Sequence, residues 1–227
     1  MQEGLFTEGL FTFLKDLQRH NDRAWFAENK ERYVEAVQQP ALEFVRAFAP
    51  FLAEISSQFV ADGRPVGGSL SRIYRDVRFT DKSPYKTHVV ISFRHRLGKD
   101  VQMPGYHLYL GPGEVFAAAG IWHPDRETLH RIRTAIVQKP RDWEKATGGE
   151  AFSARFRLSG DKLKRAPAGF GPDHPLIEDL KWKDYFALAM FDERTAIRGD
   201  FVPLFARTCS GATPFMRFLC QALGRPF

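Results

Sequence analysis

The hydrophobic period changes twice along this chain, and the order of these periods constrains the fold more than any other feature. Apolar residues recur at helical spacing to about residue 55, alternate with polar residues over about residues 69–122, and then return to helical spacing. A block of short strands between two groups of helices is typical of an α+β domain. We therefore predict a single domain over residues 1–227, with an antiparallel meander of about four strands and the helices packed on one face of it.

Three amphipathic helices are expected before the sheet. The first covers about residues 8–19, the second ends near residue 39, and Pro40 suits the first position of the third. Pro50 lies inside the third pattern and is expected to kink or split that helix. After the sheet, helical patterns cover residues 124–137, 141–147, 176–186 and 200–223, the last with an interruption at 211–214.

The first two strands are predicted at residues 69–79 and 85–93, joined by a hairpin turn. In the second of them Val89, Ile91 and Phe93 are apolar and alternate with a polar set, so the two faces of the strand are distinguishable. A five-residue turn over residues 80–84 would place three pairs on the polar face: Arg78 with Lys86, Asp76 with His88, and Arg72 with Ser92.

Two further strands, near residues 106–110 and 115–122, are expected to extend the meander across the turn at 111–114. On the same alternation, His107 and Tyr109 are expected on the polar face. This face therefore collects the ionisable and aromatic side chains of the predicted sheet.

Positive charge is concentrated in residues 69–99, which we call the basic segment. It holds eight Lys or Arg against two Asp, a surplus of +6 that equals the formal net charge of the whole chain. Because like charges repel, such a concentration favours an anionic ligand or partner. We predict an anion site formed by Arg72, Tyr74, Arg78, Lys82 and Lys86.

Asp76, His88 and His107 are the candidates for proton transfer on the same face. A carboxylate that holds one imidazole nitrogen can orient the other as a general base. A hydrogen bond that only stabilises the hairpin is the competing interpretation. The chain has no GxSxG, P-loop or GxGxxG motif, so neither a reaction nor a cofactor is predicted.

Two classes of function follow from this face. The first is a protein, enzyme or not, that binds or processes a phosphate-bearing or other anionic small molecule. The second is a nucleic-acid or protein interaction module, in which a flat basic face follows a phosphate backbone without catalysis. A concave site would favour the first class, and a steep salt dependence of binding would favour the second.

No metal site is predicted, because the spacing of Asp76, His88, His107 and His123 is not diagnostic of one. Cys209 and Cys220 lack a CxxC spacing and are expected to be buried, reduced thiols. The N-terminus has no basic region before an apolar run, and no apolar run is long enough to span a bilayer. We expect a cytoplasmic protein without a membrane partner.

Four segments together resemble a widespread uncharacterised family known only as domain of unknown function 2461. They are NDRAWFAENKERY at 21–33, GGSLSRIYRDVRFTDKSPYKTH at 67–88, GIWHP at 120–124 and LKRAPAGFGPDHPLIEDLKWKDY at 163–185. The resemblance spans nearly the whole chain and implies a single domain in which these segments come together. It implies no established activity.

Overall fold

A curved antiparallel sheet forms the centre of the protein. The structure, a computed structural model, describes residues 4–76, 83–98 and 102–227. Within these residues six strands pair in the order β1-β2-β3-β4-β6-β5. The strands are β1 (Phe59–Val60), β2 (Val89–His95), β3 (Gly105–Gly111), β4 (Glu114–Ile121), β5 (Arg157–Ser159) and β6 (Tyr185–Phe191).

Helices precede and follow the strands, as predicted. The N-terminal group comprises α1 (Glu8–Arg19), α2 (Arg23–Glu28), α3 (Lys30–Tyr33), the π-helical turn η1 (Val34–Gln38) and α4 (Gln39–Ile55). The later group comprises α5 (Arg126–Gln138), α6 (Pro140–Gly148), α7 (Glu150–Ser153), α8 (Ile177–Leu180), α9 (Glu193–Ala196), α10 (Phe201–Gly211) and α11 (Thr213–Ala222). The predicted α+β class with an antiparallel sheet is confirmed.

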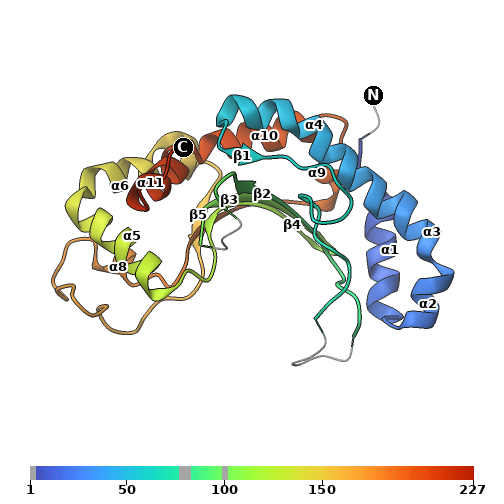
Figure 1. Ribbon diagram of the computed structural model, residues 1–227, viewed down its shortest axis with the longest axis horizontal. Helices are drawn as coiled ribbons and strands as arrows, with labels where there is room; N and C mark the ends of the chain where they lie inside the picture. Colours follow the sequence, from blue (N-terminus) through green and yellow to red (C-terminus); the bar gives the residue numbers. More distant parts are fainter. Residues whose placement is uncertain (1–3, 77–82, 99–101) are drawn as a thin grey trace.

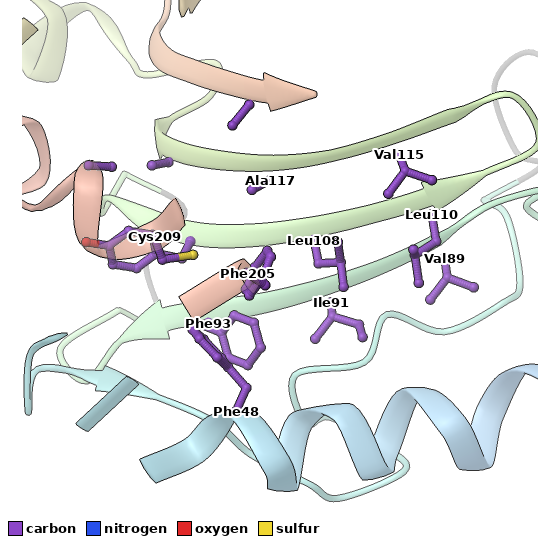
Figure 2. Close-up of a cluster of buried hydrophobic side chains, with 14 of the residues drawn as sticks. Phe48, Val89, Ile91, Phe93, Leu108, Leu110, Val115, Ala117, Phe205 and Cys209 are labelled. Atoms are coloured by element: carbon purple, nitrogen blue, oxygen red, sulfur yellow. The ribbon is translucent and has the colours of Figure 1, made fainter. Parts of the chain in front are cut away.

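One face of the sheet carries the hydrophobic core. Figure 1 shows α4 and α10 lying over this face. The alternation predicted for β2 holds, because Val89, Ile91 and Phe93 all point into the core (Figure 2). Phe48 of α4 packs between the sheet and α10, with its ring 4.7 Å from that of Phe93 and 4.9 Å from that of Phe205. Burying each such ring contributes about 1.5–3 kcal/mol to folding.

Two predictions about the elements are wrong, and a third is wrong in part. Residues 69–76 form only isolated bridges, Leu70 with Ile91 and Tyr74 with Tyr85, instead of a strand. The helix predicted at 176–186 is limited to α8, because Tyr185 begins strand β6, whose side chains alternate between the two faces of the sheet. The predicted split at Pro50 does not occur, since α4 continues to Ile55 with Pro50 exposed, and the alternative of a kink stays a prediction.

The opposite face of the sheet is concave, and no described helix covers it (Figure 1). The helices at the two ends of the sheet, α1 to α3 on one side and α5, α6 and α8 on the other, flank this face. The side chains that point from the central strands into this concavity are therefore available to a ligand.

Candidate ligand-binding site

Residues of four neighbouring strands align in rows across the concave face, because β2, β3, β4 and β6 pair in register. The first row is Val90, Tyr109, Phe116 and Met190; the second is Ser92, His107, Ala118 and Leu188; the third is Arg94, Gly105, Gly120 and Phe186. His107 and Tyr109 thus lie on the same face as Ser92, as predicted.

The middle of the second and third rows carries one large side chain, that of His107. Gly105 pairs with Gly120, and Ala118 lies two residues before Gly120 on the same strand, so the other central positions present almost no side-chain bulk. Larger side chains surround this floor and enclose a hollow of about 430 Å³, which we call the trough. Its volume lies within the range of small-molecule sites in proteins.

His107 is the polar group of the trough floor. Its Nδ1 lies 3.0 Å from Ser92 Oγ, and its Nε2 lies over Gly105, where a Cβ atom would come within 3.1 Å. Burial, and to a smaller extent the positive charge of Arg94, lower the pKa of His107 to about 4. The imidazole is therefore neutral at pH 7, and Nε2 can donate or accept one hydrogen bond with a ligand, according to the tautomer.

Aromatic rings bound the trough at both ends. At one end the rings of His88, Tyr109 and Phe116 stack in a line, with centroid distances of 4.9 and 4.6 Å. At the other end Trp122 follows β4 with 67% of its surface exposed, and its ring centroid lies 6.2 Å from that of Phe186. The lining is otherwise apolar, as is usual for small-molecule sites.

Charge in the trough is confined to its edges. Arg94 is exposed at the β2 side of the third row, and no ion pair or hydrogen bond of its side chain is recorded within the described chain. Glu114 borders the trough near the first row and raises the pKa of Tyr109, an effect secondary to that of burial. Gly120 lies in the same row as Arg94. Glu114 precedes Gly120 by six residues, which places it about 20 Å along β4 from that row. It does not neutralise Arg94.

The predicted register of the first hairpin is wrong. The Tyr74 to Tyr85 bridge, together with a hydrogen bond from Lys86 N to Ile73 O, shifts the two segments relative to the expected pairing. Asp76 therefore does not stand opposite His88, and Arg72 is not opposite Ser92, whose backbone N–H donates to Ser69 O. Residues 69–76 pair with the β2 segment only through isolated bridges. Alternation within residues 69–76 therefore does not determine which residues of the two segments face each other.

The residues predicted to bind an anion fall into two groups. Arg78 and Lys82 lie outside the described residues. Arg72 and Tyr74 are exposed, and Lys86 donates from Nζ to the carbonyl oxygen of Arg72 at 3.0 Å. Burial lowers the pKa of Lys86, and the neighbouring cations Arg72 and Arg75 lower it further. These side chains lie together near the start of β2, on the side of Tyr109 where the His88 ring stacks.

The candidates for proton transfer are separated as well. Burial, Lys86 and Arg75 lower the pKa of His88, whose ring lies against Tyr109 at the end of the trough. His107 occupies the trough floor, and Asp76 is exposed beyond the bridged segment. The structure thus brings His88 and His107 to the same face and leaves Asp76 outside the trough.

Sequence reasoning missed most of the trough. Arg94 continues the polar alternation of Lys86, His88 and Ser92, so this pattern could have identified it. The run of small residues in FAAAGIW at 116–122 could have indicated the low floor. Phe186 and Leu188 could not have been found without recognising β6 as a strand.

Among the described residues, no three His, Cys, Asp or Glu side chains gather into a group able to hold a metal ion. Cys209 and Cys220 are buried free thiols on different helices, α10 and α11. A search of the described chain finds no helix long and apolar enough to cross a membrane.

The fold and the trough define a class of protein: an α+β domain whose antiparallel sheet is covered by helices on one face and hollowed on the other. The sequence profile of the family described as conserved hypothetical protein (DUF2461) matches residues 9–218. The chain belongs to this family. Comparison with curated proteins gives no match.

Proposed function

We propose that the protein binds an anionic small molecule in the trough, in the cytoplasm. One observation carries this proposal: a guanidinium group, Arg94, stands exposed at the edge of a concave and largely apolar site. An apolar hollow gains affinity by burying the body of a ligand, and a single cation at its edge selects for an acidic group.

The electrostatics of the trough support an anion. Arg94 and the cluster of Lys86 with Arg72 and Arg75 lie at different ends of β2, and both ends carry positive charge. Burial first, and neighbouring cations second, lower the pKa of Lys86 and His88 at the end of β2 away from Arg94. Among the described residues Arg94 is the cation that lines the trough, so we assign the contact with the ligand to it and place Arg72, Tyr74 and Lys86 outside the trough.

His107 supplies the polar contact in the floor. A neutral imidazole with Nδ1 held near Ser92 Oγ has a defined orientation, and its other nitrogen can donate or accept one hydrogen bond. We propose a binding role for it. Proton transfer by Asp76, His88 or His107 stays a prediction from the sequence.

A concave trough favours a small molecule over the alternative of a nucleic-acid or protein interaction module. A phosphate backbone is held by cations spread along a path, whereas an acidic small molecule needs one cation beside an apolar hollow. The trough has the second arrangement.

Native mass spectrometry of gently purified protein tests the proposal. Wild type is compared with Arg94→Gln and with Arg141→Gln, a control at an exposed arginine on α6. We expect wild type and the control to retain a small acidic molecule that Arg94→Gln loses. Protein without any small molecule in all preparations, or nucleic acid that high salt removes, would contradict the proposal.

A further inference from the structure

We propose that the ligand of the trough is a planar aromatic acid of one or two fused rings. This inference rests on the proposed function and specifies the chemical class of the ligand. The small residues of the floor, the aromatic ends and the backbone that presents Trp122 each contribute an argument.

The floor suits the face of a ring. The His107 imidazole lies over Gly105, while the paired Gly120 has no side chain and Ala118 adds only a methyl group, so little side-chain bulk rises from this part of the floor. A planar ring can contact such a surface across its whole face, whereas a puckered aliphatic ring meets it at fewer atoms. The low central part of the floor therefore favours a flat ligand.

Neither glycine is readily replaced. Gly120 has φ +128°, and a Cβ atom there would lie 2.2 Å from the Tyr185 carbonyl oxygen. At Gly105 a Cβ atom would lie 3.1 Å from His107 Nε2, so its absence leaves room for the imidazole. The low floor is thus tied to the backbone of β4 and to the position of His107.

The ends of the trough offer ring surfaces. The Tyr109 and Phe116 rings lie nearly parallel, at an interplanar angle of 3°, and their stack ends beside the trough. Phe186 and Trp122 stand at the other end. Stacked or edge-to-face contacts with such rings reward an aromatic ligand beyond the area that it buries.

A special backbone corner presents Trp122. The next residue, His123, has φ +49°, a left-handed conformation that is costly for a residue with a side chain. Asp184, only 6% exposed, accepts a 2.6 Å hydrogen bond from the His123 backbone N–H and so holds this corner. A strained turn and a buried carboxylate thus hold the backbone next to a largely exposed indole. A contact between the indole and a ligand would account for this arrangement.

The spacing of the rows limits the size of the ligand. The first and third rows are four residues apart along each strand, which corresponds to about 13 Å. After the side chains of the first row take their space, one or two fused rings fit over the floor. An acidic substituent directed toward β2 then reaches Arg94, because Arg94 is paired with Gly105 in the third row.

Three probes of similar size test the inference by NMR titration of the full-length protein. They are 2-naphthoate, its saturated counterpart decalin-2-carboxylate, and 2-naphthalenemethanol, which lacks the charge. We expect 2-naphthoate to bind at least about fivefold more tightly than either of the others, since ring stacking and charge pairing each contribute.

The outcomes separate this inference from the proposed function. Equal affinity for the two carboxylates would overturn the aromatic class and leave the anion proposal standing. Equal affinity for 2-naphthoate and the alcohol would overturn the role of the anion. Absence of binding by all three probes would overturn both.

Variants at Trp122 provide a matched control at one position. Trp122→Phe retains a ring and should keep the preference for 2-naphthoate over the decalin acid, whereas Trp122→Leu should reduce it. Because Trp122 is 67% exposed, neither change is expected to unfold the protein. If Trp122→Leu keeps the full preference for 2-naphthoate over the decalin acid, the indole does not contact the ligand.

Discussion

The neutral state of His107 predicts a pH-dependent stability that one substitution should remove. In the folded protein burial lowers the pKa of His107 from 6.5 to about 4, whereas in the unfolded chain the imidazole is in water. The unfolded state therefore takes up the proton first as the pH falls. The stabilising contribution is complete above about pH 6.5 and is lost as the pH falls toward 4.

The size of this effect follows from the shift. Lowering the pKa from 6.5 to about 4 contributes about 3 kcal/mol in full to the free energy of unfolding. About 2 kcal/mol of this contribution is lost between about pH 7.5 and pH 5. Urea denaturation at these two pH values measures the free energy of unfolding of wild type and His107→Asn. We expect the variant to lose about 2 kcal/mol less than wild type on acidification.

A second histidine gives the control for this experiment. His130 is exposed on α5, and His130→Asn should show the same pH dependence as wild type. Carboxylates and His88 titrate in all three proteins, so their effects cancel in the comparison. Equal losses of stability in wild type and His107→Asn would refute the view that the trough floor holds a neutral imidazole.

Three further substitutions test the floor and the core. Ala118→Leu places a side chain in the trough, so 2-naphthoate binding should fall at least about tenfold in an NMR titration while the fold is retained; unchanged affinity would locate the ligand elsewhere. Phe48→Ala removes a fully buried ring and should lower the free energy of unfolding by about 3–5 kcal/mol in urea; a loss below about 1 kcal/mol would contradict tight packing there. Gly120→Ala should cost clearly more than Gly113→Ala, because both have positive φ but only the first meets a neighbouring backbone, at the Tyr185 carbonyl. Thermal denaturation compares the two, and equal costs would contradict the close approach.

The parts of the fold predicted correctly are those encoded locally. The β3 to β4 hairpin has apolar alternation on both sides of a short turn, and Val89, Ile91 and Phe93 identify the core side of β2 by period alone. The α+β class follows from the order of these periods. Such features require no knowledge of distant partners.

The parts predicted wrongly depend on distant pairing. Residues 185–191 (YFALAMF) are all apolar and so show no alternation, and their strand identity rests on pairing with β4, such as that of Ala189 with Ala117. Likewise, the first hairpin is governed by bridges at Leu70 and Tyr74 that alternation does not specify. Period distinguishes the faces of an element but not its partner or register.

The candidate site was predicted only in part for the same reason. The alternation of β2 and β3 identified the face that holds His88, His107 and Tyr109. The trough itself exists because Gly105 and Gly120, fifteen positions apart in the sequence, become paired neighbours in the sheet. A hollow made by the absence of side chains becomes visible only once the register is known.

A crystal structure of the protein soaked with 2-naphthoate tests the central claim most directly. The account predicts density for the ring system over Gly105 and Gly120, with the carboxylate at the Arg94 guanidinium. Density only at Arg72 and Lys86, or an empty trough at saturating 2-naphthoate, would contradict it.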